Sequence, residues 1–365
     1  MLTSPQNGLI NWLITHLLRP VFLWAANPVL SGANGPMPSP MVCRPHTKGW
    51  RYGFTHYGIM VADLPAPHQF LACASMLGTS GMRAFDNDFA VDRRDGPRHT
   101  ATLVHGTAVA TDKPFTRYSV PHDMTLADDG SLIRFGNDLE ISGVYPHYRL
   151  KSQRPEFAVD LALTATGDFN WFAKGAIYDH FSLLMRYRGT LTHQGQVTEV
   201  SGLCTYEYAR LTSLHALVNR ILPRRLKIPW DVFSFQVINL DADTQLLLIH
   251  TRLGGVPLFT TAYLRGVGQG GDRIAGDVQF KLLSTQTPAA FAPDGRTTTL
   301  PDTFQWLIRD ASNTLIYEIN ATVDTPMLFG LGAGYVGGYR WQGLCHGQAA
   351  SGRGYIEYID QRTPH

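Results

Sequence analysis

The chain has 365 residues, of which 35 are glycine and 22 are proline, and 44% are hydrophobic. This length is enough for one large core or two ordinary ones, and we predict two domains. The 31 Lys and Arg nearly balance the 29 Asp and Glu, and no basic block recurs, so we expect no nucleic-acid partner. The four cysteines fall in no metal-ligand spacing, which favours reduced thiols in a cytoplasmic protein.

The first 45 residues are predicted to be an apolar segment followed by a linker. Leu9–Leu30 is strongly apolar, but His16, Arg19 and Pro20 interrupt it, which makes it a poor membrane span and a poor signal peptide. Three alternatives remain open: packing on the β core, peripheral contact with a membrane, and contact with a second copy in a homodimer. Residues 32–45 are rich in Gly, Pro and Ser, as linkers are.

Short strand patterns occupy residues 46–225, which we predict to be the first β domain. Gly, Pro, Asp or Asn separates the strands, and no helical pattern of three turns interrupts them. The predicted strands are Trp50–Val61, Phe70–Leu77, Phe85–Val91, Ala101–Ala110, Thr116–Val120, Leu132–Phe135, Leu139–Val144 and Phe157–Thr164. Many short, regularly punctuated strands are typical of an antiparallel barrel or sandwich.

The last two strands of this domain form the clearest hairpin pattern in the chain. They are predicted at Phe181–Leu191 and Val197–Tyr208, with a polar turn at Thr192–Gly195 between them. The second strand ends in the polar and aromatic run C-T-Y-E-Y-A-R, residues 204–210. This run is the strongest candidate for chemistry in the sequence.

A connector and a second β domain follow the hairpin. Leu211–Leu222 has a helical period and is predicted to link the domains, with its basic residues on a solvated face. Residues 226–365 are predicted to be the second domain. Its expected strands are Val232–Leu240, Gln245–Thr251, Pro257–Val267, Val278–Leu283, Thr303–Ile308, Thr314–Val323, Gly338–Gln342 and Gly354–Ile359. Gly266–Gly271 has no helix after it, so we expect a flexible hairpin tip instead of a phosphate loop.

Two further motifs resemble a known family. Residues 337–343 (GGYRWQG) lead through a glycine-rich turn to residues 352–358 (GRGYIEY), and the acid-ended hairpin precedes them. This order resembles the double lipocalin-like proteins grouped with hydroxyneurosporene synthase (carotenoid 1,2-hydratase) and AttH, and the lipocalin-like Diels-Alderases. From about Phe54 to the end, the resemblance implies an all-β fold with two consecutive lipocalin-like barrel or sandwich domains. It implies no particular substrate.

In the family's hairpin motif, Glu207 takes the position of the acid. Cys204 takes the small position and Tyr208 the basic or aromatic one. Thr205 stands where the family has an aromatic residue, and Ala209 stands where it has a second acid. These two departures disfavour a mechanism copied whole from the carotenoid enzymes.

The predicted catalytic residues are Glu207, Tyr206 and Tyr208. Motifs for hydride or phosphoryl transfer are absent, and the histidines lack ligand spacing, so we predict no organic cofactor and no metal. Apolar burial would raise the pKa of Glu207 and keep it neutral, whereas Arg210 beside it would hold it ionised. Alternation puts both tyrosines on one face and Glu207 on the other, so Glu207 points away from any cavity that the tyrosines line unless a bulge re-aims it. A structural or surface carboxylate is the alternative.

Five further residues are predicted to bind substrate. His250 and Arg252 share one face of a strand in the second domain and could orient a polar group. His56 lies on an early strand of the first domain, and Trp230 and Trp341 could stabilise positive charge by cation–π attraction. Hydrogen bonding in the core or at the rim is the simpler alternative for His56, His250 and Arg252.

Two other groups are weaker candidates. Asp179 and His180 are neighbours on a strand and therefore point in opposite directions, which disfavours a dyad. Arg353, Tyr355 and Glu357 lie in the closing strand, where packing between the domains explains them as well as catalysis does.

These features support two functions from different classes. The first is a cofactor-independent enzyme, a lyase or isomerase, that hydrates, dehydrates, isomerises or cyclises a sizeable hydrophobic terpenoid, polyene, polyketide or steroid-like molecule. The second is a non-catalytic carrier of a lipid or similar ligand. An enzyme requires titratable groups that converge in the pocket, whereas a carrier requires an apolar lining with one polar anchor. A scaffold with both barrels filled by side chains would have no pocket.

Overall fold

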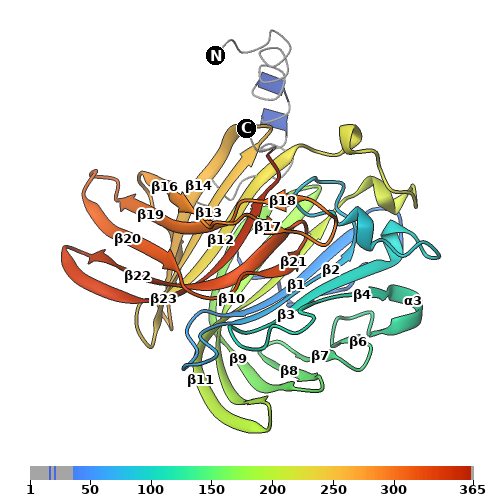
Figure 1. Ribbon diagram of the computed structural model, residues 1–365, viewed down its shortest axis with the longest axis horizontal. Helices are drawn as coiled ribbons and strands as arrows, with labels where there is room; N and C mark the ends of the chain where they lie inside the picture. The colour runs from blue at the N-terminus through green and yellow to red at the C-terminus, as the bar shows by residue number, and fades with distance from the viewer. Residues whose placement is uncertain (1–15, 18–19, 22–35, 363–365) are drawn as a thin grey trace.

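The computed structural model describes residues 16–17, 20–21 and 36–362. Nearly all of this part of the chain is β structure, arranged in two large antiparallel sheets that pack against each other (Figure 1). The predicted fold class, all-β with two consecutive lipocalin-like domains, is confirmed. No helix among the described residues combines the length and apolar character needed to cross a bilayer.

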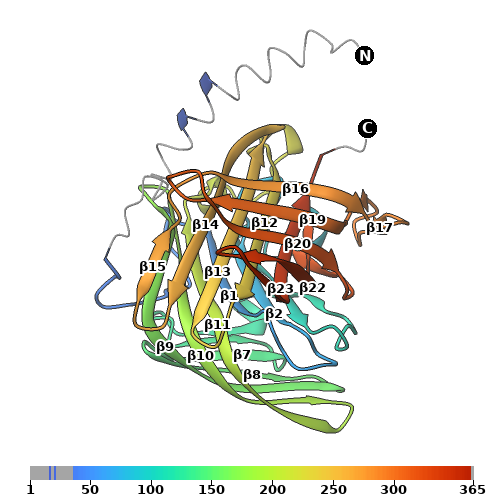
Figure 2. The ribbon, with the colours of Figure 1, turned by 90° about the vertical axis from the view of Figure 1, so that its left-hand side faces the viewer.

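The first sheet has eleven strands and curls into a nearly closed barrel (Figure 2). Its strands are β1 (Phe54–Val61), β2 (Leu71–Gly78), β3 (Thr100–Gly106), β4 (Phe115–Ser119), β5 (Met124–Leu126), β6 (Leu132–Phe135), β7 (Leu139–Val144), β8 (His147–Gln153), β9 (Phe157–Lys174), β10 (Tyr178–His193) and β11 (Gln196–Leu211). They follow the order β4-β3-β2-β1-β11-β10-β9-β8-β7-β6-β5. The first strand is therefore hydrogen-bonded to the last.

The second sheet is a half-barrel. As in the first sheet, the first strand in chain order pairs with the last. The strand order is β15-β14-β13-β12-β23-β22-β20-β19-β16, and β21 pairs with β22. The strands are β12 (Trp230–Asn239), β13 (Thr244–Leu253), β14 (Val256–Gly266), β15 (Gly270–Arg273), β16 (Val278–Thr285), β19 (Pro301–Arg309), β20 (Leu315–Val323), β21 (Leu328–Leu331), β22 (Gly334–Cys345) and β23 (Gln348–Asp360). A separate pair is formed by β17 (Ala290–Phe291) and β18 (Thr297–Thr298).

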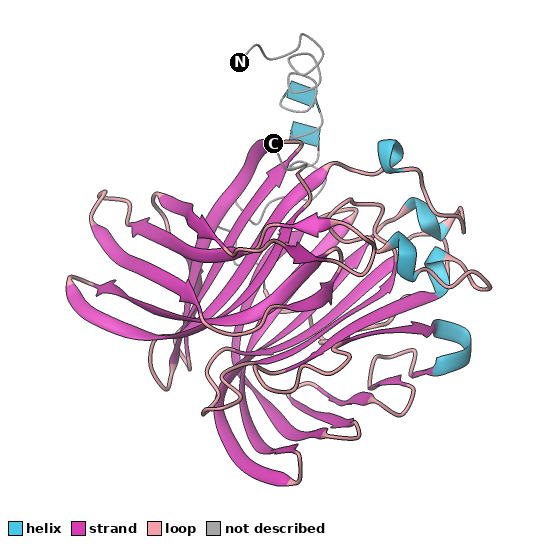
Figure 3. Cartoon of the chain, in the orientation of Figure 1, coloured by secondary structure: helices cyan, strands magenta, loops and turns pink. Residues whose placement is uncertain are grey.

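Short helical turns lie in loops on one side of the β structure (Figure 3). They are η3 (Asp88–Ala90), η4 (Pro97–His99), α3 (Val120–Asp123), η5 (Leu214–Ala216) and η6 (Arg224–Leu226). The last two belong to the segment that links β11 to β12.

Three apolar cores account for the strand sequences. A barrel core fills the first sheet, a second core lies on the inner face of the half-barrel, and an inter-sheet core joins the two sheets. Strand β8 alternates buried and exposed residues because only one of its faces is covered. In contrast, β1 is buried along its whole length, because one face contacts the barrel core and the other the inter-sheet core. The candidate site lies in this inter-sheet layer.

A hairpin tip of the second sheet is fixed to the first sheet. The backbone N–H groups of Gly268 and Gly270 donate hydrogen bonds to the Asp168 carboxylate at 3.1 and 2.8 Å, and Asn170 Nδ2 donates to the carbonyl of Gly271 at 2.9 Å. A Cβ on Gly271 would lie 2.6 Å from the Asn170 side chain, so the close approach requires glycine. The predicted hairpin tip is present, but it is a contact between the sheets instead of a free loop.

The predicted helix at Leu211–Leu222 is wrong. Strand β11 continues to Leu211, and only the short turn η5 follows it. Ser213 Oγ donates to the carbonyl of Thr79 at 2.8 Å, and Asn219 Nδ2 donates to the carbonyl of Asp95 at 2.7 Å. These bonds to neighbouring loops, together with burial against them, replace the main-chain bonds of a helix.

The predicted strand at Phe85–Val91 is also wrong. Its backbone turns into η3, where the N–H of Ala90 donates to the carbonyl of Asn87 at 3.0 Å. Just before this turn, the Asp86 carboxylate accepts bonds from the N–H and hydroxyl of Ser80, both at 2.9 Å. Asp and Asn side chains favour such turns over a strand. The predictions for Leu9–Leu30 lie almost entirely outside the described residues, and the exact domain limits stay predictions.

Candidate functional site

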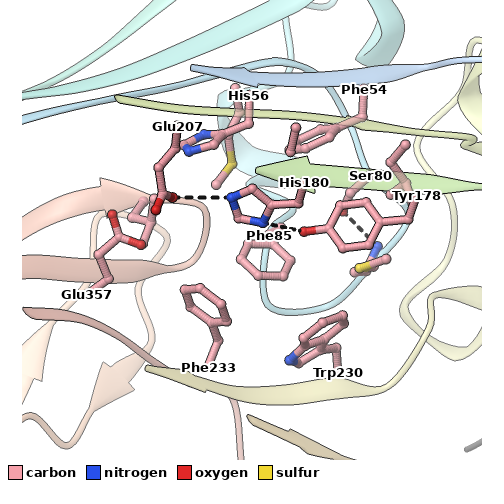
Figure 4. Close-up of a pocket in the computed structure, with 15 residues that line it drawn as sticks. Phe54, His56, Ser80, Phe85, Tyr178, His180, Glu207, Trp230, Phe233 and Glu357 are labelled. Atoms are coloured by element: carbon pink, nitrogen blue, oxygen red, sulfur yellow. Dashed lines mark hydrogen bonds and ion pairs between the residues drawn. The ribbon is translucent and has the colours of Figure 1, made fainter. Parts of the chain in front are cut away.

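A pocket opens between the two sheets, and its lining comes from both (Figure 4). The lining residues are Phe54, His56, Met76, Ser80, Met82, Phe85, Tyr178, His180, Glu207, Ala209, Leu211, Trp230, Phe233, Leu331 and Glu357. Most are apolar, and the polar groups converge on one side. The free volume of this cavity is about 40 Å³, which is room for a few water molecules.

Aromatic rings form the partly exposed side of the pocket. Phe85 packs edge-on against Phe233 and Trp230, with ring centroids 5.1 and 5.6 Å apart. Phe85, Phe233 and Tyr178 are half-buried, whereas the carboxyl groups lie deeper. Rotation of these rings is the simplest way for the pocket to admit a ligand larger than a few waters.

Glu207 is a buried carboxyl group directed into this pocket. It lies on β11, opposite Gly58 of β1 and Ser182 of β10. Its side chain is 2% exposed, and its Oε1 has no hydrogen-bond partner among the described residues. Burial raises the pKa of Glu207 to about 8, although the charge of Arg265 opposes the shift. The carboxyl group is therefore mostly protonated at pH 7.

His180 and Tyr178 extend from Glu207 as a chain of hydrogen bonds. His180 Nε2 lies 3.2 Å from Glu207 Oε2, and its Nδ1 lies 2.8 Å from the hydroxyl of Tyr178. Burial lowers the pKa of His180 to about 3, so the ring is neutral at pH 7. In this neutral ring one nitrogen donates and the other accepts, so the chain of hydrogen bonds holds the Glu207 carboxyl group in place.

His56 adds a second neutral imidazole. Its Nδ1 donates to the carbonyl of Ser75 at 2.9 Å, because a carbonyl can only accept, and this leaves Nε2 unprotonated in the neutral ring. Burial, followed by the nearby His180, lowers the pKa of His56 to about 3. The two imidazole rings meet edge to face with centroids 6.1 Å apart.

Glu357 brings a second carboxyl group from the other sheet. It lies on β23, is 3% exposed, and its Oε1 accepts a hydrogen bond from the hydroxyl of Tyr355 at 3.1 Å. In Figure 4 its carboxyl group faces that of Glu207. Burial, and then the proximity of Glu207, raise the pKa of Glu357 well above its usual value. Two buried carboxyl groups that face each other resist ionising together, so at most one of them carries a charge.

Arg265 is a fully buried guanidinium behind Glu207. It donates to Ser182 Oγ and Thr205 Oγ1, both at 3.0 Å, and to Gln245 Oε1 at 2.6 Å. Burial lowers the pKa of Arg265 to about 9, and Glu207 opposes that shift. Arg265 is thus a cation held by neutral oxygens from both sheets.

The pocket contains three of the eight residues predicted from the sequence, namely Glu207, His56 and Trp230. Arg210 does not contact Glu207, because its Nε and Nη2 both donate to Asp179 Oδ2 at 3.0 and 2.6 Å. The prediction that Glu207 points away from the tyrosines is correct, but the second sheet covers that face, so the side chain is buried without a bulge.

Tyr206 and Tyr208 lie on the opposite face of β11, in the barrel core. Tyr206 stacks on Tyr148 with ring centroids 4.8 Å apart, and the hydroxyl of Tyr208 donates to the carbonyl of Arg44 at 2.8 Å. The sheet separates both rings from Glu207. Strand alternation is the reason, and it removes them from the site around that carboxyl group.

His250, Arg252 and Trp341 also lie away from the pocket. His250 Nδ1 is 2.9 Å from Thr260 Oγ1 and its ring packs on Phe280, while Arg252 donates to the carbonyl of Gly255. Trp341 belongs to the core of the half-barrel. These side chains alternate with residues that face the inter-sheet core, so they point to the other side of their strands.

His180 and Glu357, which line the pocket, are only weak candidates from the sequence. Ser182 pairs with Glu207 in the hairpin, and His180, two residues before Ser182, lies on the same face of β10. The position of the turn predicts this register, so the sequence does contain a signal for His180. The signal for Glu357 is a repeated dipeptide, because Glu207–Tyr208 and Glu357–Tyr358 occupy the last strand of each sheet. In both, the glutamate faces the other sheet and the tyrosine faces its own core.

Comparison with known proteins places this pocket in a recognised fold. The model of the Family of unknown function (DUF6670) matches residues 74–365, and no curated protein matches the chain. A protein assigned as AttH from Nitrosomonas europaea is similar in structure, with a TM-score of 0.60 and 14% identity over 92% of this chain and 99% of its own. Kievitone hydratase from Nectria haematococca is also similar in structure, with a TM-score of 0.53 and 14% sequence identity over 90% of this chain and 95% of its own. These similarities show a shared fold, as the sequence motifs implied.

Proposed function

The chain belongs to the Family of unknown function (DUF6670), and we propose that it is an enzyme that adds water to, or removes it from, a hydrophobic molecule. The observation that carries this proposal is Glu207, a protonated carboxyl group with a free oxygen in an apolar pocket. Protonation of a carbon–carbon double bond needs an acid of this kind, and apolar burial is how proteins keep a carboxyl group neutral at pH 7.

Glu207 serves as acid and then as base. In hydration, its proton moves to one alkene carbon while the π bond breaks and a C–H bond forms. Water then attacks the cationic carbon, a C–O bond forms, and the surplus proton of that water returns to the Glu207 carboxylate. A pKa near 8 suits both steps, because the carboxylate formed in the first step is basic enough to recover the proton. Dehydration follows the reverse path.

The surrounding side chains suit a cationic intermediate. The faces of Phe85, Phe233 and Trp230 can stabilise positive charge by cation–π attraction. His180 holds Glu207 Oε2 through a hydrogen bond and leaves Oε1 free for the substrate. A pKa of about 3 makes His180 a weak base, so its role is to orient the carboxyl group instead of removing a proton.

The similarity to kievitone hydratase supports hydration over the other reactions considered from the sequence. The carrier alternative is less well supported, because the pocket contains two carboxyl groups and two imidazoles instead of a single polar anchor. The small enclosed space supports entry of one unsaturated end of a larger apolar molecule.

A panel of isoprenoid, prenylated aromatic and polyene alkenes in ²H₂O tests the proposal. The wild-type protein should add deuterium and oxygen to at least one of them, as detected by mass spectrometry. Glu207→Gln should reduce the rate by about 10²–10⁴-fold, because the proton donor is lost. Glu199→Gln is the matched control, since Glu199 is exposed on the same strand. Tight binding of panel members without turnover would establish a carrier and contradict the proposal.

A further inference from the structure

The connector between β11 and β12, residues 212–229, exposes an unusual number of apolar side chains. Six of the fourteen exposed large apolar residues in the described part of the chain fall in it. The five most exposed of these six are between 44% and 69% exposed, namely Leu214, Leu217, Val218, Ile221 and Leu226. Single exposed apolar residues are common, but a concentration of them in one short segment indicates an interaction surface.

The same segment carries positive charge with no acid of its own. Arg220, Arg224 and Arg225 are exposed, and residues 212–229 contain no Asp or Glu. Hydrogen bonds from Arg98 and Asn219 tie the connector to the neighbouring loop, which exposes Arg93, while the exposed Arg94 is paired with Asp95. Aliphatic side chains flanked by arginines are the combination that binds the surface of an anionic membrane.

The connector also forms the outer layer of a pocket wall. The N–H of Ile228 donates to the carbonyl of Gly81 at 2.9 Å, and the N–H of Arg83 donates to the carbonyl of Ile228 at 3.0 Å. The strip held in this way, residues 79–83, contributes Ser80 and Met82 to the pocket. The connector thus packs against a strip that lines the apolar pocket.

We propose that residues 212–229 dock on an anionic lipid surface, so that an apolar substrate passes from the bilayer into the pocket beneath. Charge complementarity selects this occupant, because the connector has three exposed arginines and no acid in its own sequence, and this favours lipid phosphates over a neutral surface. The transfer of substrate rests on the proposed function, whereas docking does not. This assignment replaces the solvated basic face that the sequence predicted for the connector.

Vesicle flotation of the full chain tests docking. Wild-type protein should float with vesicles that contain phosphatidylglycerol and much less with phosphatidylcholine alone, and high salt should weaken binding. The triple variant Leu217→Ser, Ile221→Ser, Leu226→Ser should lose at least about tenfold in affinity, because three exposed aliphatic contacts are removed. Arg220→Glu with Arg225→Glu should lower affinity for the anionic vesicles only.

The matched control is Val144→Ser, Val197→Ser, Leu283→Ser, whose targets are exposed to a similar extent on other strands. It should float as the wild type does, and thermal unfolding should show that all variants fold. Three outcomes overturn the proposal: no flotation of the wild type, unchanged flotation of the connector triple variant, or dissociation of a dimer by that variant, which would identify a second copy as the occupant.

A second measurement separates docking from chemistry. With an alkene dissolved in detergent, the connector triple variant should match the wild-type rate, and with the alkene in anionic vesicles it should be several-fold slower. Glu207→Gln should float normally. Flotation without turnover by any form would keep the docking surface and reject the proposed reaction, whereas equal rates of the triple variant in both media would reject substrate transfer.

Discussion

The two sheets present the same dipeptide in the same kind of strand, yet its two copies have different surroundings. Glu207 and Glu357 each lie on the strand that comes last in its sheet in chain order, and each faces the opposite sheet. Glu207 contacts an imidazole, lies near a guanidinium and keeps one oxygen free, whereas Glu357 accepts a hydrogen bond from Tyr355. Burial keeps Glu207 neutral, and burial together with Glu207 raises the pKa of Glu357, so we assign the reactive acid to the first copy only.

Removal of each carboxyl group in turn gives the largest expected difference. Glu207→Gln should lower hydration about 10³-fold, while Glu357→Gln should lower it about tenfold, because the second group lines the pocket but is not the proton donor. Rates with the substrate found in the alkene panel give the measurement. Equal losses in both variants would show that the two carboxyl groups act as one catalytic unit.

The pH dependence of stability should separate the two glutamates as well. The pKa of Glu207 is about 8 in the folded chain against a usual value of 4.5, so the folded state holds a proton that the unfolded state releases. Its contribution is therefore full below pH 4.5 and is lost as the pH rises to about 8. His56 and His180 act in the opposite direction, but only between about pH 3 and 6.5.

Between pH 6.5 and 8, the wild type should therefore lose about 2 kcal/mol more unfolding free energy than Glu207→Gln does, as measured by urea titration of both proteins. Glu199→Gln, on the exposed part of the same strand, should follow the wild type. Equal changes in the wild type and Glu207→Gln would contradict a protonated Glu207.

Replacement of Arg265 should have a smaller effect on Glu207. Burial and Glu207 both raise the pKa of Glu357, whereas the charge of Arg265 lowers the pKa of Glu207. Arg265→Met should therefore shift the alkaline limit of activity upward, by about one pH unit or less at the distances usual for such pairs. The infrared C=O band of the protonated carboxyl groups, followed as a function of pH, provides a reading that needs no substrate. Arg210→Met is the control, because Arg210 pairs with Asp179, and it should leave the midpoint in place.

The tyrosines that follow the two glutamates should show the smallest difference. Tyr208 donates to the carbonyl of Arg44 at 2.8 Å, while Tyr358 donates to Asp360 at 3.4 Å. Tyr208→Phe should cost about 1 kcal/mol of unfolding free energy and Tyr358→Phe less, because the shorter bond to a buried hydroxyl is lost. Neither should change turnover by more than about twofold if both rings serve only their own cores.

The strands were predictable where turn residues mark their ends. The structure gives β6 and β7 the predicted limits, and the hairpin of β10 and β11 is longer than predicted by a few residues at each end. The alternation of side chains along a strand also placed Glu207 and the two tyrosines, Tyr206 and Tyr208, on opposite faces of β11. It could not show what covers each face, because the second sheet that buries Glu207 comes from residues distant in sequence. The same limit hid Glu357 and misplaced His250, Arg252 and Trp341.

The pocket depends on both units of the chain, because each sheet supplies part of its lining. A single lipocalin-like unit taken from this chain would keep one of the two facing carboxyl groups and would expose half of the lining to water. The contact of Gly268 and Gly270 with Asp168 would likewise lack its counterpart. In any related chain, a change on one inner face should therefore be accompanied by a compensating change on the other.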